Sequence, residues 1–311
     1  MKIPGEIIKN ILQGKGRGRV SPAGLSPALF IVGVPRSGTT LLRLMCDAHP
    51  ELSIPPEMGF IPAVADLRGR GDELREAFLA AVTGTGTWED ANIERAQFEH
   101  ALREIEPFTV AQGVRAFYRI YAARFGKSRY GDKTPFYCLH MDGIEKLLPE
   151  ARFVHIIRDG RDVALSQRGL WFAPGERIEE LAHQWRSWIM TARRVGRRRR
   201  HYLEVRYEEL IEDAPGVLRR VCDFVELPYD RQMERYYEFA GERLDEVKTV
   251  YRSDGTPLIT KAERLYNQRF TTQPPEPARI SRWRNEMDAE TRAGFAHVAG
   301  DLLKELGYPN D

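Results

Sequence analysis

The sequence contains little cysteine and no long apolar run. Its cysteines, Cys46, Cys138 and Cys222, stand far apart and lack metal-ligand spacing, which argues against a disulfide framework and favours reduced thiols. No stretch approaches the ~20 apolar residues of a membrane-spanning helix, and the N-terminus lacks the apolar core of a signal peptide. We therefore expect a cytoplasmic protein with no transmembrane segment.

An excess of one charge is also missing. Lys and Arg total 47 against 45 Asp and Glu, a net charge of +2, so no overall field attracts nucleic acid, and we expect no such partner. One local cluster of arginines follows a stripe of apolar residues at helical spacing. Because cations stabilise helix C-termini, we favour a solvated helix end over a contact with an acidic partner for this cluster, which comprises Arg193, Arg194 and Arg197–Arg200.

The length of 311 residues suits one domain with a substantial core. Residues 1–24 form an N-terminal extension with an isoleucine-rich amphipathic run, for which a membrane-surface or partner role stays open. Helical spacing dominates residues 63–126 and predicts a helical insertion on one side of a sheet. The segment Thr249 to Pro277 is rich in Thr, Pro and charge, and we expect a long C-terminal loop there.

The stretch from Ala28 to Glu57 organises the chain. Strand-forming residues 30–32 lead through Gly33 to Thr40 into a helical pattern at residues 41–45. The loop nearly matches G-x-x-x-x-G-K-[ST], but Thr39 replaces the lysine. Backbone N–H groups at a helix N-terminus bind anions, and the loop adds the positive charge of Arg36 and three hydroxyl groups, those of Ser37, Thr39 and Thr40. This predicts a phosphate site, with Gly38 permitting the turn.

Two later strands, at residues 152–158 and 201–207, alternate with helices and predict a parallel α/β sheet. Ligands gather at the carboxyl ends of such strands, where Arg158 and the loop both fall. From the residues alone, Lys133 belongs to a solvated turn-rich loop at 130–135, and Glu57 is an exposed carboxylate on a stiff, proline-rich connection. Four further residues are interpreted as structural: His49, His155, Trp185 and Trp188.

From Leu29 to about Trp283 the sequence resembles the sulfotransferases that use 3′-phosphoadenosine 5′-phosphosulfate (PAPS), above all bacterial members and tyrosylprotein sulfotransferases. Residues 35–40 look like their 5′-phosphosulfate loop. Arg158 with Ser166 looks like their 3′-phosphate site, Tyr207 is similar to the tyrosine beside the adenine, and Lys133 looks like the lysine held against the sulfate. The resemblance implies a P-loop-NTPase-like parallel sheet flanked by helices.

The resemblance also implies a catalytic base. In the tyrosylprotein type a glutamate follows the loop arginine at the distance that separates Glu57 from Arg36, so Glu57 is the candidate. A further 3′-phosphate arginine of that type has Arg168 as its nearest counterpart, although Leu170 occupies the counted position. Arg282, after a proline-rich loop of different length, is the candidate for a late phosphate contact.

The function implied is in-line transfer of the PAPS sulfuryl group to a hydroxyl of a small metabolite, lipid or glycan. The helical insertion would shape the acceptor side, and no metal is expected because Arg36 and Lys133 supply the charge. A P-loop kinase-like phosphotransferase and a non-catalytic 3′-phosphoadenosine nucleotide-binding protein remain alternatives, and a homodimer is left open. The missing loop lysine argues against the kinase.

Overall fold

A parallel sheet of five strands forms the centre of the computed structural model, which describes residues 25–309. The N-terminal extension 1–24 therefore lies outside the described residues. The strand order is β2-β3-β1-β4-β5, and all four pairings are parallel, which confirms the predicted α/β class. The strands are β1 (Ala28–Gly33), β2 (Leu52–Ser53), β3 (Arg129–Lys133), β4 (Ala151–Ile157) and β5 (Tyr202–Arg206).

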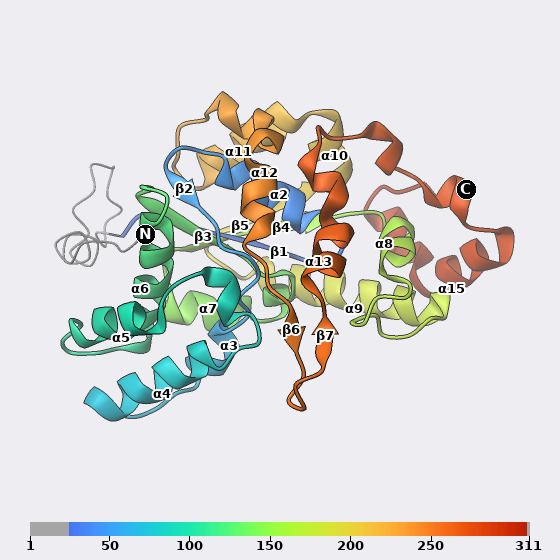
Figure 1. Cartoon of the computed structure of the whole chain (residues 1–311). Helices are drawn as coiled ribbons and strands as arrows, with labels where there is room; N and C mark the ends of the chain where they lie inside the picture. The colour runs from blue at the N-terminus through green and yellow to red at the C-terminus, as the bar shows by residue number, and fades with distance from the viewer. Residues whose placement is uncertain (1–24, 310–311) are drawn as a thin grey trace.

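Helices cover both faces of this sheet, as Figure 1 shows. Every residue of β1 is buried, and successive side chains enter different cores: Phe30 and Val32 one, Leu29 and Ile31 the other. The first core includes helices α3 (Ile61–Ala65), α4 (Gly71–Thr83), α5 (Arg95–Arg103), α6 (Val110–Ala123) and α7 (Met141–Leu147). The second includes α2 (Thr39–Asp47), α10 (Tyr207–Glu212), α11 (Ala214–Phe224) and α12 (Tyr237–Asp245).

A third core lies around the helices that follow β4. It contains side chains of α8 (Gly160–Gln167), α9 (Ile178–Gly196), α14 (Trp283–Glu286) and α15 (Ala289–Glu305). Trp185 is fully buried here, as predicted. Asp288 caps α15 by accepting from the Thr291 N–H, and Gly307, with a φ of 76°, lies just beyond its end, where a left-handed residue commonly terminates a helix.

The predicted insertion at residues 63–126 is helical, with one difference inside it. The helical spacing continues through residues 88–105, whereas the chain there forms a 3-10 turn, Trp88–Ala91, and then α5. Asn92 between them has a φ of 49°, a left-handed conformation that interrupts a helix and that asparagine tolerates well.

The loop predicted at residues 130–135 is wrong, because residues 129–133 form β3 between β1 and β2. Gly131 is required by packing rather than by a turn: a Cβ there would lie 2.7 Å from the Leu29 carbonyl oxygen. Asp132 occupies the strand because its carboxylate accepts a hydrogen bond from the buried Tyr118 hydroxyl at 2.8 Å. Lys133 thereby ends a buried strand.

The long loop predicted from Thr249 to Pro277 is also wrong. The segment forms a hairpin of β6 (Val250–Tyr251) and β7 (Pro257–Ile259), then α13 (Lys261–Gln268) and two short 3-10 turns, Arg269–Thr272 and Pro277–Arg279. Thr260 and Glu263 form a capping box at the start of α13. No residue of α13 is buried, and most of its eight residues are polar or charged, so this short helix gives little signal in the sequence.

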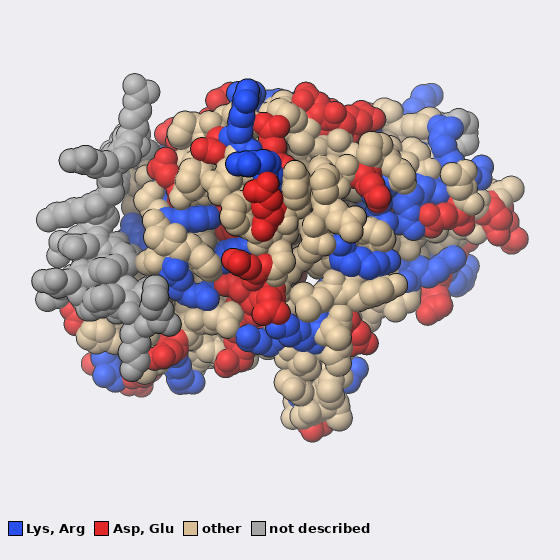
Figure 2. Space-filling view, turned by 45° about the horizontal axis from the view of Figure 1, so that its top comes forward, with Lys and Arg blue, Asp and Glu red and all other residues tan. Residues whose placement is uncertain are grey.

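The arginine cluster at the C-terminal end of α9 is partly neutralised within the chain. Arg193 pairs with Glu204 and Glu305, and Arg199 pairs with Asp142 and Glu145. Figure 2 shows the same mixture elsewhere, with acidic and basic side chains interspersed over the face in view. No helix between residues 25 and 309 is both long and apolar enough to cross a lipid bilayer.

Candidate active site

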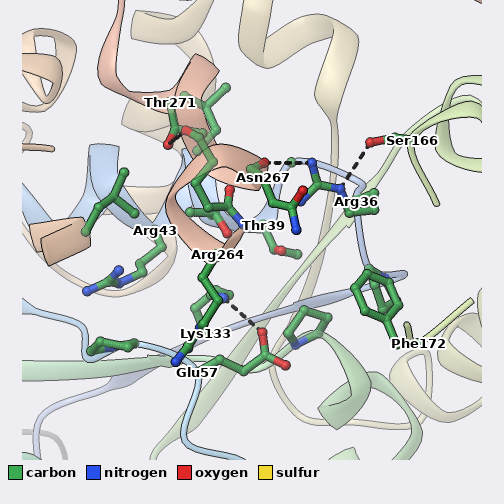
Figure 3. A pocket seen from close by; sticks show the side chains of 18 of the residues that line it. Arg36, Thr39, Arg43, Glu57, Lys133, Ser166, Phe172, Arg264, Asn267 and Thr271 are labelled. Carbon is green, nitrogen blue, oxygen red and sulfur yellow. Dashed lines mark hydrogen bonds and ion pairs between the residues drawn. The ribbon is translucent and has the colours of Figure 1, made fainter. Parts of the chain in front are cut away.

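A cavity of about 530 Å³ lies where the strands end, and most of the predicted site residues line it. Lys133 is the last residue of β3, Arg158 and Tyr207 directly follow β4 and β5, and the phosphate loop follows β1. Figure 3 shows several of these side chains converging on the cavity. The lining includes Arg36, Gly38, Thr39, Thr40, Glu57, Lys133, Arg158, Ser166 and Tyr207. Arg168 and Arg282 do not line it, and neither does Ser37, which is fully buried within the loop.

The phosphate loop joins β1 to α2 through a conformation that its glycine permits. Gly38 caps α2 with a φ of 97°, and a Cβ at this position would lie 2.4 Å from Cδ2 of Tyr207. The N–H groups of the first turn of α2 have no partner within the helix. The Ser37 hydroxyl is buried and has no hydrogen-bond partner among the described residues. This arrangement suits an anion with several acceptor oxygens.

Arg36 is held at the centre of a group of like charges. Its Nε donates to the Ser166 hydroxyl at 3.0 Å, and its Nη2 donates to the Asn267 carbonyl of α13 at 2.9 Å. Burial lowers the pKa of Arg36 to about 10, and the neighbouring guanidinium groups of Arg158 and Arg279 add to the effect. A bound anion would relieve both the burial cost and the repulsion.

A second anion position centres on Arg158, directly after β4. Its guanidinium lies 4.3 Å from the centroid of the Tyr207 ring, donates to the Arg279 carbonyl at 2.8 Å and contacts Asp162 at 3.3 Å. Its Nε is buried without a hydrogen-bond partner in the described chain. The phosphate loop and Arg158 therefore give the cavity two anion positions, which fits a nucleotide that carries two separate anionic groups, as PAPS does.

Arg279 is a cavity residue that sequence reasoning did not single out. It lines the cavity, whereas Arg282 pairs with Glu286 on the surface. The run Arg279-Ile280-Ser281-Arg282 offered two arginines. Ser281, with a φ of 57°, turns the chain between them, and the sequence gives no signal for that turn.

Glu57 and Lys133 both line the cavity and are in contact. Lys133 Nζ lies 3.1 Å from Glu57 Oε2, and the lysine side chain is 8% exposed against 41% for the glutamate. The Glu57 side chain is therefore accessible from the cavity, whereas its cation partner Lys133 is buried. The two predicted structural histidines lie elsewhere: His49 contacts the Pro228 carbonyl, and His155 is buried in β4 against Tyr202, where burial lowers its pKa to about 4.

Two aromatic contributions were also missed. Trp188 packs against two of the hydrophobic cores, as expected, but it is only half-buried and also lines the cavity from α9. Trp171 and Phe172, between α8 and α9, line it as well. No group of three or more His, Cys, Asp or Glu side chains within residues 25–309 is arranged to hold a metal ion.

Comparisons with known proteins give the family. The profile described as "Sulfotransferase family" matches residues 27–231. The chain is 26% identical to protein-tyrosine sulfotransferase A of Caenorhabditis elegans, covering 92% of this chain and 68% of that protein. It is 28% identical to nodulation protein NoeE of Sinorhizobium fredii, covering 93% and 67%.

Solved structures agree on the fold. The sulfotransferase domain from the Synechococcus PCC 7002 olefin synthase superposes with a TM-score of 0.58 at 24% identity, covering 95% of this chain and 98% of that one. The sulfotransferase domain from the curacin biosynthetic pathway gives 0.57 at 17% identity, covering 92% and 99%. The chain therefore belongs to the sulfotransferase family, whose sulfuryl donor is PAPS, and it is a sulfotransferase enzyme.

Proposed function

We propose that this sulfotransferase transfers the sulfuryl group of PAPS in line to a hydroxyl of a small metabolite, lipid or glycan, with Glu57 as the proton acceptor. The observation that carries the proposal is the contact of 3.1 Å between Glu57 and Lys133 inside the cavity that holds the phosphate loop. A carboxylate and a cation beside an anion-binding loop are the groups that such a transfer requires.

The phosphate loop, Arg36 and Lys133 would stabilise the negative charge that develops on the leaving group. PAPS supplies an activated sulfuryl group, whose bond to the 5′-phosphate oxygen breaks as a bond to the acceptor oxygen forms. Negative charge grows on the departing phosphate, and Arg36, Lys133 and the loop N–H groups stabilise it. Because Arg36 is already bound to Ser166, it is oriented before the nucleotide arrives.

Glu57 would accept the proton of the acceptor hydroxyl. As the acceptor oxygen bonds to sulfur, its proton passes to the Glu57 carboxylate. Lys133 keeps this carboxylate in one orientation by donating to its Oε2 at 3.1 Å. A carboxylate is a weak base, so the arrangement favours an acidic hydroxyl over an unactivated one.

The 3′-phosphate would bind between Arg158, Ser166 and Arg279. Arg158 is fixed by Asp162 and by stacking under Tyr207, which leaves its Nε for the ligand. Arg168 and Arg282 stay outside this proposed set because neither lines the cavity. We assign the donor and acceptor sites to a single domain. The insertion 63–126 contributes Thr87 to the lining of the cavity.

Calorimetry tests the proposal. We expect 3′-phosphoadenosine 5′-phosphate, the product of the donor, to bind at least ~100-fold more tightly than ATP with magnesium, since two guanidinium groups await a 3′-phosphate that ATP lacks. Tighter binding of ATP would overturn the proposal in favour of a kinase-like phosphotransferase. Binding of the 3′-phosphorylated product without turnover of PAPS on any hydroxyl would instead indicate a nucleotide-binding protein.

A further inference from the structure

The backbone of Ile54, three residues before Glu57, is held at both of its polar groups by buried side chains. Its N–H donates to Asp47 Oδ1 at 2.7 Å. Its carbonyl accepts from Arg43 Nε at 2.9 Å, and Arg243 Nη2 lies 3.5 Å from the same oxygen. Asp47 and Arg43 belong to α2, the helix that follows the phosphate loop, and Arg243 belongs to α12. Two helices therefore fix the start of the connection that carries the proposed base.

Two prolines pass this fixed position on to Glu57. The rings of Pro55 and Pro56 lock φ at about −65°, and a proline also keeps the residue before it out of the helical conformation. Both prolines are buried. On the other side of Glu57, the Met58 carbonyl accepts from the Thr87 hydroxyl at 3.0 Å. Glu57 therefore stands on a short, stiff segment that is anchored at both ends.

A buried ion pair between Asp47 and Arg243 forms the centre of the first anchor. Arg243 Nε lies 2.6 Å from Asp47 Oδ2 and Nη2 lies 3.0 Å from Oδ1, so the guanidinium bridges both oxygens. The Tyr121 hydroxyl accepts from Arg243 at 2.8 Å and donates to Glu246 at 2.5 Å. Burial opposes the ionisation of Asp47, but the Arg243 guanidinium holds the pKa of this carboxyl below its usual range. Because desolvation offsets most of the attraction in a buried ion pair, stability alone does not account for these charges.

This ion pair lies apart from the nucleotide groups. Asp47 and Arg243 are buried and do not line the cavity, so neither contacts a substrate there. Arg43 does line the cavity, and Figure 3 shows it well away from Arg36 and Ser166. Figure 1 shows α12 beside α2, against which it packs. The route from the pair to the chemistry therefore runs through the backbone of residues 54–57.

We propose, on the basis of the function proposed above, that Asp47 and Arg243 are positioning residues for the proton transfer. Together they fix Ile54, and the two prolines transmit its position to the Glu57 carboxylate. This carboxylate must lie beside the acceptor hydroxyl while the acceptor oxygen attacks sulfur. A displacement of ~1 Å at such a site can lower the rate by ~100-fold.

The test compares Arg243→Met with Arg115→Met as a matched control. Arg115 also bridges a carboxylate, with Nε and Nη2 at 2.7 and 2.9 Å from the two Glu150 oxygens, but neither residue lines the cavity. Both variants should unfold at lower urea concentrations than the wild type. We expect kcat to fall ~10-fold or more in Arg243→Met and to stay within ~3-fold in Arg115→Met. The Kd of 3′-phosphoadenosine 5′-phosphate should stay within ~3-fold in both.

A double-mutant cycle with Glu57→Gln separates positioning from a general effect on the fold. Turnover is measured as product release from radiolabelled PAPS, with 4-methylphenol as the acceptor probe. In the Glu57→Gln background, Arg243→Met should lower kcat by less than ~3-fold, because no carboxylate remains to be displaced. A crystal structure of Arg243→Met with 3′-phosphoadenosine 5′-phosphate gives a readout that needs no acceptor. It should show Glu57 beyond hydrogen-bond distance of Lys133, with residues 35–40 unmoved.

Equal losses of kcat from Arg243→Met with and without Glu57 would overturn the positioning role, and so would a crystal structure in which Glu57 has not moved. Unchanged turnover in Glu57→Gln would instead overturn the proposed function. Arg243→Lys guards against a failure of Arg243→Met to fold, because it keeps the charge opposite Asp47. A single ammonium cannot reproduce the planar fork, so this variant should fold and still lose kcat by ~3-fold or more. Full activity in Arg243→Lys would show that the fork does not position the base.

Discussion

Lys133 at the end of β3 holds Glu57 at 3.1 Å across 76 positions of sequence. The Lys133 side chain is buried, whereas the Glu57 carboxylate is exposed to the cavity, where an acceptor can contact it. It is made possible by β3 lying beside β1, which brings Lys133 to the same sheet edge as the phosphate loop. The contact joins the two chemical tasks of the site, leaving-group stabilisation and proton removal.

The first prediction concerns Glu57→Gln. The amide keeps the size of the side chain and a hydrogen-bonding oxygen but cannot accept the proton, so turnover should fall by ~100-fold or more. Binding of 3′-phosphoadenosine 5′-phosphate should change by less than ~3-fold, because the carboxylate is not part of the phosphate loop. Steady-state kinetics and calorimetry measure the two effects.

Glu276→Gln is the control for Glu57, since Glu276 also lines the cavity but is exposed and far from Lys133 in sequence. It should retain near wild-type turnover. Unchanged turnover in Glu57→Gln would remove this residue from the role of base.

The second prediction compares two arginines. Arg279→Ala should weaken 3′-phosphoadenosine 5′-phosphate about 10- to 100-fold, the range for a hydrogen bond to a charged group. AMP, which lacks the 3′-phosphate, should bind both forms within ~3-fold. Arg282→Ala should leave both affinities near wild type, because Arg282 pairs with Glu286 outside the cavity. The opposite ranking would restore Arg282 as the phosphate contact.

The third prediction concerns Gly38→Ala. The substitution places a Cβ 2.4 Å from the Tyr207 ring at a φ of 97°, so the loop must shift or Tyr207 must move away from Arg158. Nucleotide affinity should fall by more than ~10-fold, and unfolding should need about 1–3 kcal/mol less. The control is Gly241→Ala in α12, where a Cβ meets nothing within 4 Å, and which should be neutral or stabilising by up to ~1 kcal/mol.

Local patterns allowed part of this site to be predicted from sequence. The phosphate loop is a continuous stretch, so its strand, turn and helix could be inferred from neighbouring residues. Lys133 could not be placed that way, because the charged strand β3 is stabilised by its neighbours β1 and β2 and by the Tyr118 hydroxyl rather than by apolar alternation. Trp171 lies in an irregular connection and Arg279 ends a three-residue 3-10 turn, and the course of both segments depends on contacts distant in sequence.

The last prediction concerns the pH dependence of stability through Asp132, which lies next to Lys133 on β3. Burial raises the pKa of Asp132 to about 7, although the Tyr118 hydroxyl, at 2.8 Å from Oδ2, opposes the shift. Oδ1 is buried with no hydrogen-bond partner in the described chain. In the unfolded chain an aspartate ionises near ~3.9. Between these two values the folded state binds more protons, so this group lowers the free energy of unfolding as pH rises from ~4 to 7.

Asp132→Asn removes this dependence while keeping an oxygen to accept from Tyr118. Relative to the wild type, the variant should therefore gain stability as pH increases from 5 to 7.5, measured by urea unfolding at each pH. Asp66→Asn, at a side chain 94% exposed, controls for the loss of a carboxylate. A constant difference between Asp132→Asn and wild type across the range would mean that Asp132 ionises equally in both states. Lys133, the adjacent residue, would then be the cation that keeps this buried carboxylate charged, and the strand would carry an ion pair into the active site.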